Sequence, residues 1–196
     1  DAVAELAERL RNTYPYPDPA YAGQMLKPPA PVAWAAYATA MLLNPNNHAL
    51  DGGPATAELE REAVEELRAM LGVPAPGLGH LTSSGTVANL EALWVARELT
   101  GGATVLSSEA AHYTHARMCG VLGVEHEAVA ADARGRMDLA GLEERLGRGG
   151  VGTVVATVGT TSLGALDDAG AIAYLCAAHG ARLHVDTAYG GFFALL

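Results

Sequence analysis

The residues best suited to chemistry stand where apolar stretches of the chain are expected to end. The strongest candidate reads LHVDTAYGG, residues 183–191. Its apolar first half predicts a strand, and alternation along a strand places His184, Asp186 and Ala188 on one side. Asp186 then stands at the carboxyl end, where open α/β sheets bind ligands. A strand that ends in an ordinary Asp-initiated turn explains this stretch as well, and the stretch alone does not decide between them.

A second stretch, LTSSGTVANL at residues 81–90, places small hydroxylated side chains and a glycine directly before an expected helix. Free backbone N–H groups at a helix start, together with Ser and Thr hydroxyls, form a cradle for a phosphate group. No lysine follows, so the stretch is not a nucleotide P-loop, and the absence of G-x-G-x-x-G weakens a dinucleotide interpretation. A plain capped helix remains the alternative.

Two further stretches follow other expected strands. EAAHYTH, residues 109–115, places His112 and His115 three positions apart, but no acidic or cysteine partner at a suitable spacing supports a metal site. His112 is suited to stacking on a planar ligand, and a surface histidine is the alternative. VGTTSLG, residues 158–164, leads from a strand into hydroxyls and glycines. By itself this stretch is a polar loop. Taken together with the stretches at the other strand ends, it would line one side of a single ligand-binding crevice.

Together these sites provide a binding site for a phosphate group, a flat side-chain ring that can stack on a ligand, and a buried carboxylate. A planar aromatic phosphate with a basic ring nitrogen needs all three, and pyridoxal 5'-phosphate is such a molecule. Since a nearby opposite charge favours the charged form of a titratable group, Asp186 would keep the pyridine nitrogen protonated. The protonated ring acts as an electron sink for a carbanion. We therefore expect pyridoxal phosphate as the cofactor, and no metal.

The elements that must position these side chains alternate in type, which is typical of an α/β fold with a mostly parallel sheet covered on both faces. Apolar periodicity and turn residues predict strands at 104–106, 124–130, 151–158 and 182–185, and helices at 86–99, 112–122, 138–146 and 169–178. Earlier in the chain, helices are expected at residues 3–10 and 31–43, and from an N-cap at Thr56 to residue 71.

Composition narrows the class of protein. The 196 residues, half of them hydrophobic, suffice for one core or for part of a larger one. A net charge of -10 argues against nucleic acid or an anionic membrane as a partner. The longest apolar run, residues 31–43, is too short for a membrane span of ~20 residues, and no basic, apolar leader opens the chain. Two isolated cysteines, Cys119 and Cys176, suit a reducing compartment, so we expect a cytoplasmic protein.

The stretches at 82–90, 111–114, 159–161 and 184–191 resemble motifs of the pyridoxal-phosphate-dependent group II amino-acid decarboxylases, which have the aspartate-aminotransferase fold type. Two N-terminal stretches, at 19–25 and 54–60, support the match, which runs in order along nearly the whole chain. The resemblance implies fold type I of the pyridoxal-phosphate-dependent enzymes. It divides the chain into residues 1–55, an N-terminal helical arm for dimerisation, and residues 56–196, part of the large cofactor-binding domain.

The resemblance also implies roles for individual residues. Asp186, at the ring nitrogen, and His112, stacked on the ring, would be the catalytic residues. Tyr21 and Gln24 would border the substrate pocket. The cofactor-binding set comprises Ser84, Gly85 and Thr86 at the phosphate, Thr161 near the ring substituents, Ala188 on the other ring face, and His112 and Asp186.

The activity that the resemblance implies is decarboxylation of an L-amino acid to an amine and carbon dioxide by a homodimer. The run NLEALW at residues 89–94 favours the bacterial tyrosine/aspartate branch. The family's Schiff-base lysine lies beyond the aspartate motif, and the single lysine here, Lys27, matches no catalytic position. We therefore expect this chain to be the N-terminal portion of a longer enzyme, without that lysine and the small C-terminal domain, and inactive alone. The alternatives are another fold-type I enzyme (a desulfurase, lyase or aminotransferase) and a truncated non-catalytic relative.

Overall fold

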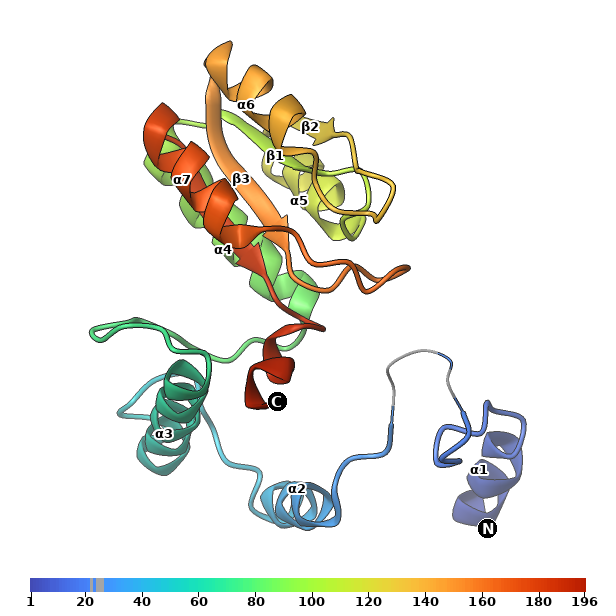
Figure 1. Ribbon diagram of the computed structural model, residues 1–196. Helices are drawn as coiled ribbons and strands as arrows, with labels where there is room; N and C mark the ends of the chain where they lie inside the picture. The colour runs from blue at the N-terminus through green and yellow to red at the C-terminus, as the bar shows by residue number, and fades with distance from the viewer. Residues whose placement is uncertain (22, 24–26) are drawn as a thin grey trace. The chain divides into compact units, whose positions relative to one another are not determined.

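The structure is a computed structural model that describes residues 1–21, 23 and 27–196. It divides into two compact units, Asp1–Glu58 and Leu59–Leu196, and each is described by itself. The elements, labelled in Figure 1, are α1 (Ala2–Leu10), α2 (Pro31–Leu43), α3 (Pro54–Met70), α4 (Gly85–Thr100), β1 (Thr104–Ser108), α5 (Thr114–Leu122), β2 (His126–Val129), α6 (Leu139–Gly147), β3 (Val151–Thr157), α7 (Ala169–His179), β4 (Arg182–Asp186) and the 3-10 helix η1 (Gly191–Leu195).

A four-stranded parallel sheet in the order β2-β1-β3-β4 forms the centre of the second unit. Alternate residues of a strand face opposite sides, and the two buried clusters follow this rule. Val105 and Val155 pack with α4 and α5 on one face, whereas Leu106 and Val154 pack with α6 and α7 on the other. The expected α/β fold, with helices on both faces of a parallel sheet, is confirmed.

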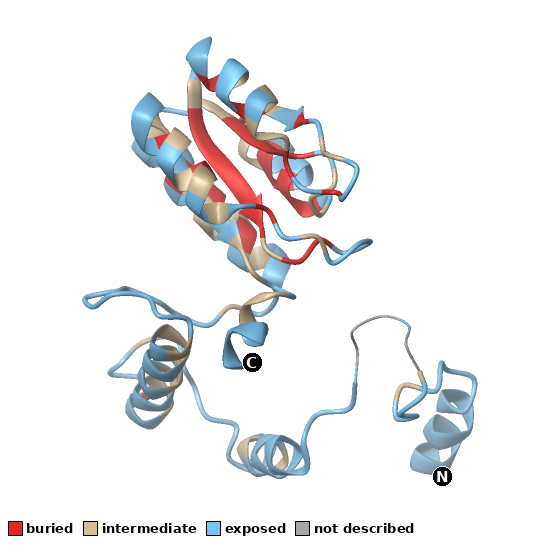
Figure 2. Cartoon of the chain, viewed as in Figure 1, coloured by how far each residue is buried: buried red, intermediate tan, exposed pale blue. Residues whose placement is uncertain are grey.

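Burial is deepest along the two middle strands, β1 and β3, as Figure 2 shows. The β-branched run VGTVVAT of β3 is buried from Gly152 to Thr157, which is the pattern of a strand covered on both faces. Because all four strands are parallel, the carboxyl ends of β1, β3 and β4 meet at one edge of the sheet. Ser108, Thr157 and Asp186 stand at those ends.

Two close contacts fix the loops at this edge. The buried carboxylate of Asp167 accepts hydrogen bonds from the backbone N–H groups of Met137 (2.7 Å) and Thr157 (2.8 Å), which ties the end of β3 to the segment before α6. Gly190 N–H donates to Val158 O at 3.0 Å, and a Cβ on Gly190 would lie 2.2 Å from that oxygen. Only glycine permits this approach between the loops after β3 and β4.

The first unit contains α1, α2 and the first turn of α3. The apolar helix α2 buries none of its residues, and large apolar side chains such as Trp34 and Leu42 are exposed. Asn44, in the left-handed conformation, ends this helix as turn chemistry predicts. In the described part of the chain, no helix combines the length and apolar character that a membrane span requires.

Four elements, α3, α5, β1 and β2, have an end two residues away from the predicted position. Helix α5 begins at Thr114, so His112 precedes the helix instead of opening it. Helix α3 begins at Pro54, which places Thr56 inside its first turn, so the prediction of Thr56 as the N-cap is wrong. There its hydroxyl donates to Gly53 O at 3.0 Å, an i−3 backbone contact that competes with capping. Strand β2 is also shorter than predicted.

We expect Asp167→Ala to lower the free energy of unfolding by about 3 kcal/mol, because two buried N–H groups lose their acceptor. Urea unfolding of the protein that contains this chain measures the loss. The neighbouring Asp168 is the exposed N-cap of α7, so Asp168→Ala is a matched control that should cost about 1 kcal/mol. Equal losses in the two variants would contradict this role of Asp167.

Candidate functional site

Asp186, the last residue of β4, is held by groups from three segments. Asn89 Nδ2 of α4 donates to its Oδ2 at 3.3 Å, and the N–H of Ala188 donates to its Oδ1 at 3.1 Å. His115 Nε2 of α5 lies 3.1 Å from Oδ2. His184 Nε2–H donates to Asn89 Oδ1 at 2.7 Å, which leaves the Asn89 amide nitrogen free to face the carboxylate. These contacts make the end of β4 the most highly connected polar site at this edge.

The same contacts set the charge of Asp186, whose side chain is only 10% exposed. The imidazole of His115 is the largest influence and lowers the pKa of Asp186, and the Ala188 N–H and Asn89 add to it. Burial acts in the opposite direction, and the net result is a pKa of about 2. The carboxylate is therefore an oriented anion at neutral pH, as the sequence indicated.

The N-terminus of α4 fits an anion. Ser84 is the N-cap, and its Oγ accepts from the Val87 N–H at 3.3 Å. The N–H groups of Gly85 and Thr86 have no acceptor within the helix, because the first turn of any helix lacks one. A Cβ on Gly85 would meet nothing within 4 Å, so the space beside the helix end is open. Ser84, Gly85 and Thr86 are all exposed and accessible to a phosphate group.

His112 lies in the loop between β1 and α5 and is half-buried. Its Nδ1 accepts from the Thr114 N–H at 3.3 Å and lies 2.6 Å from Thr114 Oγ1. An acceptor nitrogen carries no proton, so Nε2 is the protonated nitrogen of the neutral ring. The ring contacts Tyr113, with 4.1 Å between the ring centroids. The start of α5 thus fixes the orientation of the imidazole.

The loop after β3 contains two threonines that differ in exposure. Thr160 is buried, and its Oγ1 accepts from the Ala165 N–H at 3.0 Å, which closes the loop. Thr161 is exposed, as is Ala188 in the turn after β4. Within the part of the chain that the structure describes, neither His112 nor Thr161 is a hydrogen-bond or ion-pair partner of Asp186. They stand at the same sheet edge without bonding to Asp186 in the described part of the chain.

The two residues predicted to border a substrate pocket belong to the N-terminal unit. Tyr21 packs edge-to-face against Tyr16, with 5.4 Å between the centroids. Lys27 Nζ donates to Tyr21 O at 2.6 Å and to Asp18 O at 3.1 Å, so the single lysine is engaged within that unit. Gln24 lies outside the described residues.

Sequence reasoning missed the roles of Asn89, His115 and His184. It treated Asn89 only as part of the phosphate stretch and His115 only as an improbable metal ligand. The available signal was polar residues on buried helix faces. Asn89 lies at i, i+4 to the buried Leu93, and His115 stands at the same helical position relative to the buried Cys119. No cluster that could hold a metal ion occurs among the residues described.

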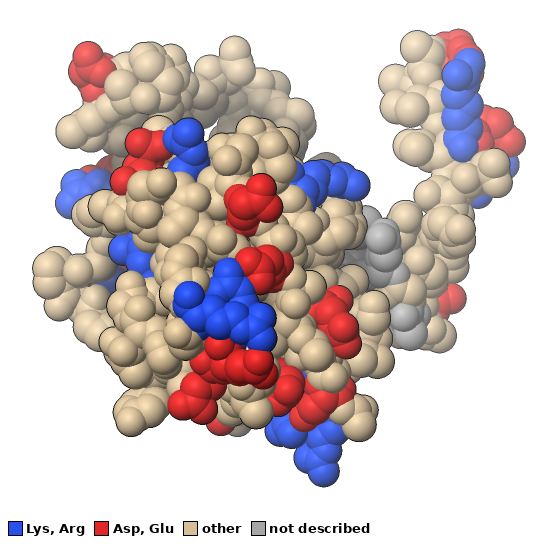
Figure 3. Space-filling model, turned by 90° about the horizontal axis from the view of Figure 1, so that it is seen from above, with Lys and Arg blue, Asp and Glu red and all other residues tan. Residues whose placement is uncertain are grey.

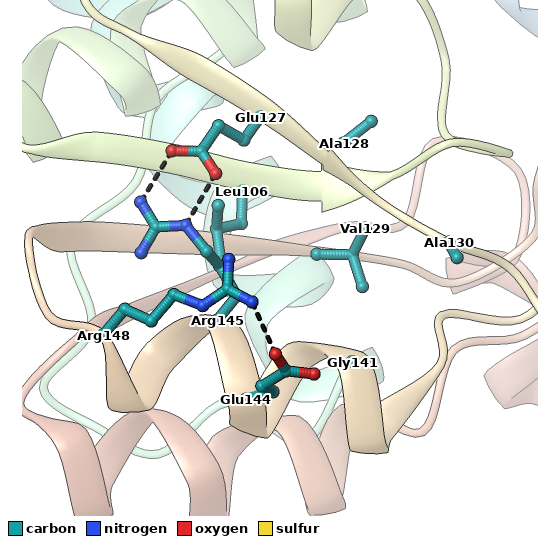
Figure 4. Close-up of a pocket in the computed structure, with 9 residues that line it drawn as sticks. All are labelled: Leu106, Glu127, Ala128, Val129, Ala130, Gly141, Glu144, Arg145 and Arg148. Atoms are coloured by element: carbon teal, nitrogen blue, oxygen red, sulfur yellow. Dashed lines mark hydrogen bonds and ion pairs between the residues drawn. The ribbon is translucent and has the colours of Figure 1, made fainter.

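A cavity of about 220 Å³ lies elsewhere, between β2 and α6 (Figure 4). Arg145 bonds Glu127 at both carboxylate oxygens beside it, and Arg148 pairs with Glu144. On the face shown in Figure 3, Lys or Arg side chains also lie beside Asp or Glu side chains. The Leu106 side chain in its wall belongs to the α6–α7 face, whereas the partners of Asp186 come from α4 and α5. The cavity is therefore separate from the candidate site.

An ionised acid at a strand end, bonded to a residue one turn into a helix whose N-terminus is open, is an arrangement that suits a pyridoxal-phosphate site. Residues 29–195 match the family described as pyridoxal-dependent decarboxylase conserved domain. The chain belongs to this family, and the expected family is confirmed. The cofactor expected from the sequence, pyridoxal phosphate, is the one on which this family depends.

Individual relatives of this chain carry the names of amino-acid decarboxylases. The chain is 38% identical to the L-2,4-diaminobutyrate decarboxylase of Rhizobium meliloti over 82% of its own length and 36% of the relative. It is 30% identical to the L-aspartate decarboxylase of Thermococcus kodakarensis over 98% of its length and 50% of that protein. The crystal structure of mouse CSAD superposes on all of this chain and 46% of that one, with a TM-score of 0.88 and 29% identity. The chain thus spans half or less of these relatives.

We expect the free energy of unfolding to respond to acid through Asp186. Its depressed pKa stabilises the fold in full above the unfolded value near 3.9, and this contribution is lost as the pH falls toward about 2. Between pH 5 and pH 2, the cofactor-free protein should lose about 2 kcal/mol more than its Asp186→Asn variant. Urea unfolding across this range measures both curves, and parallel curves would show that Asp186 is not held as described.

Proposed function

We propose that the protein containing this chain removes the carboxylate of an L-amino acid as carbon dioxide and releases the amine, with pyridoxal phosphate as cofactor. The observation that carries the proposal is the Asp186 carboxylate, ionised, almost fully buried and held at the carboxyl end of β4. Membership of the pyridoxal-dependent decarboxylase family supports it. The named activities of the relatives, on diaminobutyrate and aspartate, support the substrate class.

The residues present fit this cofactor. The free N–H groups of Gly85 and Thr86, with the Ser84 hydroxyl beside them, would hold the phosphate. Asn89, one turn further along α4, bonds Asp186, so the phosphate cradle and the acid are linked through a single helix. Asp186 would pair with the protonated ring nitrogen.

The remaining assignments of ring contacts rest on family likeness together with local geometry. His112, whose Nδ1 is fixed by Thr114, would stack on the ring and keep the Nε2 proton available. Ala188 would lie on the other ring face, and Thr161 would lie near the ring substituents. Tyr21 and Gln24 would border the substrate.

When bound, pyridoxal phosphate supplies a cationic ring that accepts the electron pair left by departing carbon dioxide. The chain's residues make this possible through charge and position. Asp186 holds a proton on the ring nitrogen, because an ionised acid with a pKa of about 2 is a poor competitor for that proton. The α4 N-terminus would hold the phosphate group and so restrict the orientation of the bound cofactor.

We further propose that residues 1–55 act as a dimerisation arm and residues 56–196 as part of the large domain. The exposed apolar side chains of α2, including Trp34, Tyr37 and Leu42, support burial against a second copy of the chain. The buried, free thiols of Cys119 and Cys176 support a cytoplasmic location.

The intact protein should release carbon dioxide and an amine when supplied with a panel of amino acids that includes diaminobutyrate, aspartate and tyrosine. Asp186→Ala should abolish turnover and retain the fold, because the ring nitrogen loses its anion. Glu143→Ala, on the exposed side of α6, is the control and should retain full activity. Near-normal turnover of Asp186→Ala would remove the assignment, and a keto acid or sulfide product would indicate another fold-type I enzyme.

His112→Ala should shift the absorbance of the bound cofactor and weaken its retention, by about tenfold for the loss of ~1.4 kcal/mol of stacking energy. Absorbance spectra and cofactor release on dilution measure both effects. His179→Ala, at the exposed end of α7, serves as the control. An unchanged spectrum together with unchanged retention would count against stacking by His112.

A further inference from the structure

His115 is a buried polar side chain that core packing does not explain. It lies on α5 with its side chain fully buried, yet neither ring nitrogen has an aligned hydrogen bond to any described residue. Leaving a buried polar group unpaired costs free energy, and such groups concentrate at functional sites. An apolar residue would fill the same place on α5 beside Met118 and Cys119 without that cost.

The groups around the ring come from several elements. Asp186 of β4 is the acid in contact, with 3.1 Å between Nε2 and Oδ2. His184 of β4 lies 6.1 Å away between ring centroids, at 70°. The third histidine near His115 is His126 of β2. Burial is the main cause that lowers the pKa of His126 and of His184, and the electrostatic influence of His115 lowers both pKa values further. Since lowered pKa values favour neutral rings, Asp186 is the charged partner of His115 at neutral pH.

Three groups contact the Asp186 carboxylate, and the positions of two of them, the Ala188 N–H and Asn89, are explained by other contacts. The Ala188 N–H fixes Oδ1, and Asn89 is itself oriented by His184. Oδ2 receives only a long bond of 3.3 Å from Asn89, so His115 is the group that restrains this oxygen most closely from the α5 side. Without His115, only the Ala188 N–H and the long Asn89 bond would restrain rotation of the carboxylate about its Cβ–Cγ bond.

We propose that His115 is a positioning residue of the cofactor site, which keeps Nε2 within 3.1 Å of Oδ2 and thereby holds the Asp186 carboxylate in the orientation that pairs with the protonated ring nitrogen. This inference rests on the proposed function. His115 touches neither cofactor nor substrate, and it acts through Asp186 alone.

Removing His115 has a defined chemical consequence. Asp186 and the ring nitrogen compete for one proton, which lies on the nitrogen while the carboxylate remains the weaker base. Loss of the imidazole makes the carboxylate more basic and less ordered. The proton on the ring nitrogen of the bound cofactor would then shift toward an oxygen of Asp186. Only this proton would move, and no other bond would form or break. A purely structural role for His115 would not move that proton.

The test uses the intact protein reconstituted with pyridoxal phosphate labelled with ¹⁵N in the ring. His115→Gln and His115→Asn form a matched pair, because both carry a neutral amide but only glutamine reaches the position of Nε2. The ring ¹⁵N resonance should keep the upfield position of a protonated nitrogen in the wild type and in His115→Gln. In His115→Asn it should move downfield, and cofactor should bind about tenfold more weakly, as expected for one lost hydrogen bond to a charged group.

Met118→Ala is the packing control, since it opens a cavity on the same buried face of α5 without changing a polar group. It should lower the unfolding temperature and leave the ¹⁵N resonance in place. Identical ¹⁵N positions and affinities in the wild type, His115→Gln and His115→Asn would overturn the role of His115. A wild type that binds no pyridoxal phosphate, or binds it with an unprotonated ring, would instead overturn the proposed function.

Discussion

The candidate site depends on a negative charge kept out of water at the end of β4. Burying a carboxylate is unfavourable unless donors replace its hydration, and here they come from α4, α5 and the turn after β4. Asn89 and Asp186 are 97 positions apart in the sequence, so the acid is stabilised only when both helices pack on the same face of the sheet. The site and this half of the core are therefore formed by the same packing.

The parallel topology explains why residues from three strand ends meet at one candidate site. Strands that run in one direction bring the loops after β1, β3 and β4 to one edge of the sheet, and helices form the crossover connections between the strands. Gly190 then allows the last two loops to touch, because its N–H reaches Val158 O where a side chain would collide. Gly190 of the aspartate stretch is thus explained by backbone approach within the fold.

Local sequence patterns predicted the alternation of strands and helices, the sheet edge and the key acid. β-Branched runs, helix caps such as Ser84 and helix-ending glycines act over a few residues, so they can be recognised without a structure. The partners of Asp186 were not predictable in this way. His115 is three positions from His112 in the sequence, yet it is buried beside the acid while His112 is held by Thr114. That difference arises because α5 begins after His112, and its rotation is set by packing against β1 and α4.

The two charged ends of the site differ in exposure for a physical reason. The N-terminus of α4 is open to water, which suits a phosphate that must arrive from solution and exchange hydration for N–H groups. The Asp186 carboxylate is shielded, which strengthens its attraction for a protonated nitrogen because the local dielectric is low. Asn89 lies four residues into α4, so about one helical turn, ~6 Å, separates the open positive end from the residue that bonds the acid. This arrangement favours a ligand that carries a negative group at one end and a positive group at the other, because the open helix end attracts an anion and the shielded carboxylate attracts a cation.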